Sequence, residues 1–177
     1  ARSGGDKWNY GSVGVGSAAH LGMELLKARA GAAAVHIPYS GNPAVVTAML
    51  GGQIHMALIP PGVAMPQVRA GKLKAIGLAG GRSALVPDLA PLADAGLPGL
   101  DLEVWTALVG PANLSRDAQA RLGREVPRIL RDPDTRQKLF NQGWQTVGTG
   151  PEGLQTRVKQ ETAALAAVIR ARGIKAE

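Results

Sequence analysis

The chain has 177 residues, a net charge of +7 and no cysteine, and it is 45% hydrophobic but only 3% aromatic. This composition suits one globular domain or slightly more with an aliphatic core, and it excludes disulfides, thiol catalysis and cysteine metal sites. The basic residues form no stripe with interleaved aromatics and no apolar run approaches about 18 residues, so we expect no nucleic-acid partner and no membrane span, whereas an acidic ligand suits the charge.

The chain opens with a strand, a turn and a helix. Residues 8–13 predict a strand that runs into a glycine turn (residues 11–17), which carries three glycines and lets the backbone approach a bound group. Ser17 is a favourable N-cap for a helix over residues 17–30, and Gly31 ends that helix. A helix N-terminus offers unpaired N–H groups, so this turn suits a carboxylate or a phosphate.

Strands and short helices then alternate up to residue 79. In chain order we expect strand 33–37, helix 43–50, strand 53–59, helix 60–70 and strand 72–79. This alternation predicts an α/β fold with a parallel sheet, in which ligands bind at the carboxyl ends of the strands. The turns at that edge are residues 11–17, 38–42 and 59–62.

The rest of the chain is more helical. Residues 80–102 are rich in turns and contain a predicted short helix at 88–95. The elements expected after them are strand 103–110, helix 115–131, helix 132–141, strand 144–147 and helix 151–171. Pro127 lies inside the first of these helices and is expected to kink or split it.

The glycine turn matches a nucleotide motif only in part. Gly14–Ala19 fits the dinucleotide pattern G-x-G-x-x-A, but that pattern needs an acidic residue about 20 positions later, and residues 25–87 contain neither Asp nor Glu. No Gly-Lys-Ser or Gly-Lys-Thr follows the turn, so a phosphate loop is also excluded. A small-anion site and a purely structural turn remain, and we favour the anion site.

Catalysis is the competing interpretation. Ser17 and His20 could act in a small α/β hydrolase-like enzyme on an acidic substrate, although the G-x-S-x-G motif is absent and this spacing is more typical of helix capping. The three histidines (20, 36 and 55) fall on different predicted elements without metal-ligand spacing, so we expect no metal and no cofactor. His36 lies in an apolar predicted strand and is expected to be a hydrogen-bonded histidine of the core or of the strand end.

Several segments together resemble one protein family. The matching segments are Tyr10–Leu21, His36–Gly41, Leu50–Met56, Ala70–Leu73, Pro87–Gly99, Trp105, Pro111-Ala112, Asp132-Pro133 and Gly143. In their order and spacing over residues 8–172 the chain resembles the solute-binding receptors of tripartite tricarboxylate transporters, also called Bug-type receptors.

This resemblance implies a periplasmic receptor of the type II periplasmic-binding-protein kind, which is not an enzyme. Two lobes close around a small carboxylate, and the receptor delivers it to a membrane permease. Residues 1–102 look like the complete second α/β lobe of the family, and residues 103–177 look like the returning part of its first lobe. The first half of that lobe and the signal peptide are not in this sequence, so we expect an N-terminally truncated receptor.

The resemblance also implies a ligand site in the first two turns. Its expected ligand-binding residues are Ser12, Val13, Gly14, Gly16, Ser17, Ala18, Tyr39, Ser40 and Gly41. Many members carry an Asp after the third strand that can meet a ligand amino group, but this chain has Leu58–Pro61 there. We therefore expect a di- or tricarboxylate or an aromatic acid. The apolar faces of helices 115–131 and 151–171 lead us to expect self-association.

Overall fold

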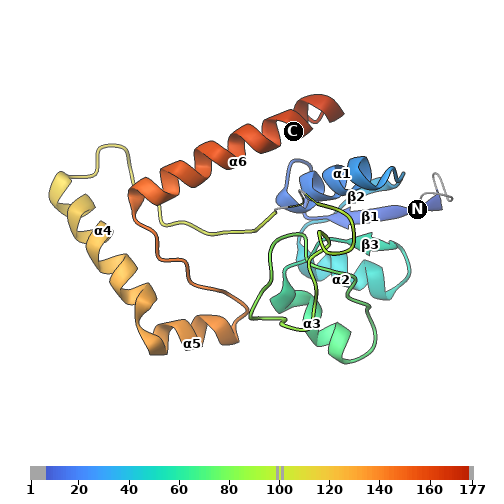
Figure 1. The fold of residues 1–177 in the computed structure, drawn as a ribbon, viewed down its shortest axis with the longest axis horizontal. Coiled ribbons are helices and arrows are strands. Elements are labelled where there is room, and N and C mark those ends of the chain that lie inside the picture. The colour runs from blue at the N-terminus through green and yellow to red at the C-terminus, as the bar shows by residue number, and fades with distance from the viewer. Residues whose placement is uncertain (1–6, 99, 101, 176–177) are drawn as a thin grey trace. The chain divides into compact units, whose positions relative to one another are not determined.

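The computed structural model describes residues 7–98, residue 100 and residues 102–175 (Figure 1). Gly99, at the end of the matched Pro87–Gly99 segment, and the outermost residues of the two expected lobes lie outside the described residues. The chain forms two compact units. One contains residues up to 104 together with those from 165 onward, and the other contains residues 105–164.

The first unit is built on a parallel sheet, as the alternation of elements predicts. Its strands are β1 (Asn9–Ser12), β2 (Val35–Pro38) and β3 (Met56–Ala57), in the order β2-β1-β3. Tyr10 stands opposite His36 on one side and Met56 on the other. Because side chains alternate along a strand, these three residues share one face of the sheet.

Three helices connect or follow these strands: α1 (Ala18–Ala30), α2 (Asn42–Leu50) and α3 (Pro61–Arg69). As predicted, Ser17 is the N-cap of α1, and Gly31 ends the helix with a left-handed φ of 58°. Pro43 and Pro61 lie in the first turns of α2 and α3, where their missing N–H groups cost nothing.

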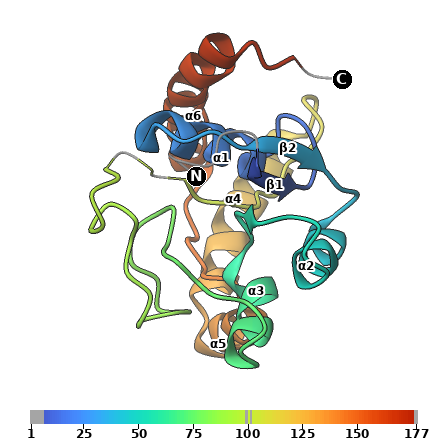
Figure 2. The ribbon, with the colours of Figure 1, turned by 90° about the vertical axis from the view of Figure 1, so that its right-hand side faces the viewer.

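Apolar side chains pack on both faces of the sheet. On the face of α1, Tyr10 packs with Met23 and Ala34. On the face of α2, the core contains Val45, Ala48 and Ile54. Figures 1 and 2 show α1 and α2 on opposite sides of the strands. The result is the layered βαβ arrangement in which parallel sheets are buried.

Two elements predicted after α3 do not form. Residues 72–79 are not a strand. Leu78 makes only an isolated parallel bridge with Pro91, and the helix expected at 88–95 is a series of turns. The two errors have one cause: the N–H of Leu92 donates to the carbonyl of Leu78, while the N–H of Leu78 donates to the carbonyl of Ala90. Tertiary pairing between these segments replaces both local structures.

The second unit contains α4 (Arg116–Arg131), α5 (Pro133–Asn141) and the first part of α6 (Pro151–Arg172). The expected split at Pro127 is wrong, because α4 continues through it as one helix. Pro127 is buried, and this packing offsets the hydrogen bond that Pro127 cannot donate. Ser115 and Asp132 cap α4 and α5, and the hydroxyl of Ser115 accepts from the N–H of Ala118.

The strands expected at 103–110 and 144–147 are also absent from the described residues. Val109 is 80% exposed and Val147 is 66% exposed, and no described segment pairs with either stretch. A strand needs a partner for its N–H and C=O groups, so an apolar run alone does not make one.

Trp105 is attached to α6 inside the second unit. Its Nε1–H donates to Glu161 at 2.7 Å, and the Nε–H of Arg157 donates to the same carboxylate at 2.7 Å. The guanidinium of Arg157 also lies over the Trp105 ring, 5.6 Å from its centroid. These contacts anchor an otherwise irregular segment. None of the described helices is both long and apolar enough to cross a bilayer.

Candidate functional site

The glycine turn lies at the carboxyl end of the central strand, β1. Gly14 and Gly16 have φ values of 126° and 77°, which side-chain-bearing residues rarely adopt. The hydroxyl of Ser17 donates to the carbonyl of Gly14 at 2.8 Å and accepts from the N–H of His20 at 3.2 Å. The predicted capping role of Ser17 is therefore confirmed, and the cap also ties the turn to α1.

The second predicted turn lies beside the first. The N–H of Tyr39 donates to the carbonyl of Ser12 at 2.9 Å, and Gly41 is the N-cap of α2. Of the nine expected site residues, Ser12 is buried, Val13, Gly16 and Ser40 are exposed, and Gly14, Ser17, Ala18, Tyr39 and Gly41 are half-buried. The structure thus brings the two turns together at one edge of the sheet.

Ser12 differs from the other eight because it is buried. Ser12 is only 1% exposed, and its Oγ lies 2.7 Å from His36 Nε2. The same hydroxyl lies 3.0 Å from the carbonyl oxygen of Gly14 and 3.2 Å from its N–H. The side chain of Ser12 therefore shapes the turn from beneath.

Backbone N–H groups at this edge are available to an anion. Among the described residues, none accepts a hydrogen bond from the N–H of Val13, Val15 or Ala18. The helices α1, α2 and α3 each follow a strand after a short turn, and they carry no acidic residue in their first turns. By contrast, α4, α5 and α6 begin with Asp117, Asp134 and Glu152. The sheet edge therefore carries uncompensated positive helix ends.

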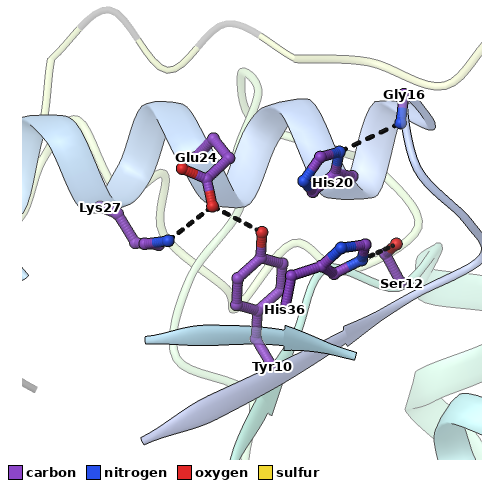
Figure 3. A network of polar contacts seen from close by, with 7 residues as sticks. All are labelled: Tyr10, Ser12, Gly16, His20, Glu24, Lys27 and His36. Atoms are coloured by element: carbon purple, nitrogen blue, oxygen red, sulfur yellow. Dashed lines mark hydrogen bonds and ion pairs between the residues drawn. The ribbon is translucent and has the colours of Figure 1, made fainter. Parts of the chain in front are cut away.

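Beneath the turn lies a buried polar network that links α1 to the sheet (Figure 3). The hydroxyl of Tyr10 donates to Glu24 at 2.7 Å, and Lys27 Nζ lies 2.6 Å from the same carboxylate oxygen. The rings of His20 and His36 stack with centroids 4.1 Å apart, and His36 also stacks on Tyr10 at 5.0 Å. The N–H of Gly16 donates to His20 Nδ1 at 3.1 Å.

Burial sets the ionisation of this network. Burial, together with the hydrogen bond and charge of Glu24, raises the pKa of Tyr10 far above its ordinary value, so its hydroxyl stays a donor. Burial lowers the pKa of His20, against the opposing effect of Glu24. Burial and the neighbouring His20 ring lower the pKa of His36. Both imidazoles are therefore neutral at pH 7.

Sequence reasoning missed three members of this network: Tyr10, Glu24 and Lys27. Glu24 is the last acidic residue before the long acid-free stretch, and Lys27 follows it at helical (i, i+3) spacing. That spacing could have indicated the ion pair between Glu24 and Lys27, but only the tertiary structure places Tyr10 against Glu24. His36 meets its prediction, since it is a hydrogen-bonded histidine in β2.

Ser17 and His20 are not arranged as a nucleophile and its general base. The hydroxyl of Ser17 bonds the backbone N–H of His20, whereas the His20 ring accepts from Gly16. General-base catalysis needs the ring itself within reach of the hydroxyl. Within the described part of the chain, no three His, Cys, Asp or Glu side chains are grouped to hold a metal ion.

Comparison with known proteins bears on both fold and family. The model of the Tripartite tricarboxylate transporter family receptor matches residues 1–174. The chain is 30% identical to the UPF0065 protein in the tcbD-tcbE intergenic region of Pseudomonas sp. strain P51, over 92% of this chain and 49% of that protein. It therefore spans about half the length of this curated relative, and of others that it matches.

Two solved structures share the fold. MatC from Rhodopseudomonas palustris, with bound malate, is 29% identical with a TM-score of 0.81, and the match covers 94% of this chain and 58% of that one. The periplasmic binding protein BugD, at 23% identity and a TM-score of 0.83, matches 99% of this chain and 60% of its own. The expected periplasmic-binding-protein fold is confirmed. The matching family is a receptor family and BugD is a periplasmic binding protein, so the hydrolase alternative is not retained.

Proposed function

The chain belongs to the receptor family of the tripartite tricarboxylate transporters, and we propose that its glycine turn and second turn bind a small carboxylate. The observation that carries this proposal is the set of N–H groups of Val13, Val15 and Ala18, which no described residue accepts from, beside helix ends without acidic residues. Such donors stabilise a carboxylate without any proton transfer.

A dicarboxylate is the ligand class that we favour. The similar protein MatC was solved with bound malate. In this chain Leu58–Pro61 follows β3, so the described residues of that stretch offer no carboxylate for a ligand amino group. Tricarboxylates and aromatic acids are the other candidates, and we favour all of these over amino acids.

The whole protein is proposed to be a two-lobed receptor that hands its ligand to a membrane permease from the periplasm. Family membership supports the permease partner and the compartment. Residues 1–102 are assigned to one lobe and residues 103–177 to the other. In this proposal the chain contributes one side of the ligand site.

Isothermal titration of the 177-residue chain with malate, succinate, citrate, benzoate and aspartate tests this function. Binding of one or more of the first four, with aspartate weaker, is the expected result. Absence of heat with every acid at millimolar concentration would refute carboxylate binding by this chain.

Replacing Ser17 with alanine is expected to weaken malate binding about tenfold, because the turn loses the hydroxyl that holds Gly14 to the start of α1. Ser115→Ala is the matched control, since it removes the equivalent cap from α4. Both variants should lose about 1 kcal/mol of stability, but only Ser17→Ala should bind malate more weakly. If titration calorimetry gave Ser17→Ala and Ser115→Ala the same malate affinity, Ser17 would not belong to the ligand site.

We also propose that the chain self-associates. Leu122, Ile129 and Val158 are each more than two-fifths exposed on α4 and α6, and apolar side chains exposed in this way favour contact between copies. Light scattering should show a mass that rises with concentration. Leu122→Gln with Ile129→Gln should reduce that rise, and a constant monomer mass in the parent chain contradicts the proposal.

A further inference from the structure

His20 touches the glycine turn where the turn joins α1. The N–H of Gly16 donates to His20 Nδ1 at 3.1 Å, and the side chain of His20 is buried (Figure 3). Because Nδ1 accepts this bond, the proton of the neutral ring is on Nε2. Gly16 has a positive φ of 77°, so this contact bears on a residue in the left-handed region.

The second histidine keeps the first in place. The ring of His36 lies parallel to that of His20 within 20°, at a centroid distance of 4.1 Å. His36 Nε2 in turn contacts the hydroxyl of Ser12 at 2.7 Å, and the His36 ring rests on Tyr10. The stack therefore reaches the glycine turn at both ends, through Ser12 and through Gly16.

Building on the carboxylate-binding function proposed above, we propose that His20 is a positioning residue of the ligand site. Its unprotonated Nδ1 accepts from the N–H of Gly16 and so holds the turn. A proton on Nδ1 breaks this bond, releases the turn and lowers the affinity for the ligand. A protonated Nδ1 is a donor and cannot accept from another N–H. His36 has no equivalent effect. A protonated His36 ring carries a hydrogen on Nε2, which can donate to the Ser12 oxygen while the Ser12 hydroxyl donates to the carbonyl of Gly14.

The charged groups around the two rings come from α1, β1 and β2. Glu24 on α1 favours a proton on either ring, while Lys27 disfavours it. Tyr10 on β1 stays neutral, and its hydroxyl donates to the Glu24 carboxylate. Burial is the largest influence on each histidine. The charge of His20 also disfavours a proton on His36, so the pair takes up one proton before the second.

The sign of the pH effect follows from these pKa directions. Both histidine pKa values lie below the ordinary 6.5 in the folded chain. Well above pH 6.5 both histidines are unprotonated in the folded and in the unfolded chain. As the pH falls below 6.5, the unfolded chain binds protons first, so folding stability declines until the pH has passed the folded pKa values. Release of Gly16 occurs in the lower part of the same window.

Malate titration of the full chain between pH 7.5 and 5 tests the proposal with two variants. His20→Asn keeps an acceptor near the position of Nδ1 but cannot be protonated, whereas His20→Leu lacks the acceptor. Malate affinity of the parent chain should fall up to about tenfold per pH unit below the pKa of the pair, relative to His20→Asn. The comparison cancels the titration of malate itself. His20→Leu should bind about fivefold more weakly at pH 7.5.

His55→Asn is the matched control, because His55 contacts Asn9 at the amino end of β1, away from the turn. It should follow the pH curve of the parent chain. Identical curves for the parent chain and His20→Asn would overturn the positioning role. So would full affinity in His20→Leu.

An NMR titration separates this proposal from the function on which it rests. Without ligand, the amide signal of Gly16 should shift with the ring signals of His20, while the amide of Gly81, which lies in a loop outside the turn, should not. If no carboxylate binds at any pH, carboxylate binding by this chain fails, yet the Gly16 signal still decides whether His20 holds the turn. If the ring signals of His20 titrate while the amide signal of Gly16 does not shift, the positioning role of His20 is refuted.

Discussion

Replacing Glu24 with alanine should lower the free energy of unfolding by about 3–5 kcal/mol, the largest loss that we expect from a single substitution in the first unit. Glu24 is buried and receives both the hydroxyl of Tyr10 and the ammonium of Lys27. Without it, a buried hydroxyl and a largely buried cation lose their acceptor in one step, and α1 loses its polar contact with β1. Urea denaturation followed by circular dichroism measures this loss.

The matched control for Glu24→Ala is an exposed ion pair in the same unit. Arg82 and Asp94 lie 2.9 Å apart, but their side chains are 71% and 51% exposed. Asp94→Ala should therefore cost less than about 1 kcal/mol. Glu24→Gln should fall between the two, since an amide oxygen still accepts from Tyr10. Equal losses in Glu24→Ala and Asp94→Ala would show that the network contributes no more than a surface pair.

Replacing Gly14 with alanine is expected to reduce malate affinity at least about tenfold, since a side chain at its φ of 126° costs about 1–3 kcal/mol. An added Cβ meets no atom within 4 Å, so the effect comes from the backbone and not from a clash. Relaxation of that strain breaks the bonds of Gly14 to the hydroxyls of Ser12 and Ser17. The turn that carries the N–H groups of Val13 and Val15 then changes its conformation. Titration calorimetry measures the affinity.

Gly81→Ala is the control for this substitution. Its added Cβ also meets no atom within 4 Å, but Gly81 has no positive φ. It should retain both the stability and the malate affinity of the parent chain. If Gly14→Ala bound malate as well as Gly81→Ala does, the conformation of the turn would not matter for the ligand.

Local chemistry made the helices and the glycine turn predictable. Ser17, Ser115 and Asp132 supply caps in which each side chain bonds an N–H of its own helix. Glycines with positive φ end or shape the turns. These features depend on residues only a few positions apart, so the sequence alone determined where these helices begin and where the turn lies.

Strands and buried polar contacts required the tertiary structure, because each depends on a partner distant in sequence. Residues 72–79, 103–110 and 144–147 have strand-like composition, but the described part of the chain offers them no strand to pair with. The bond between Tyr10 and Glu24 and the contact between Ser12 and His36 also cross between elements. The sequence by itself determined a parallel α/β unit with a glycine turn at the end of its central strand. Only the tertiary structure decided which buried groups hold that turn, because burial and pairing arise when α1 closes over the sheet.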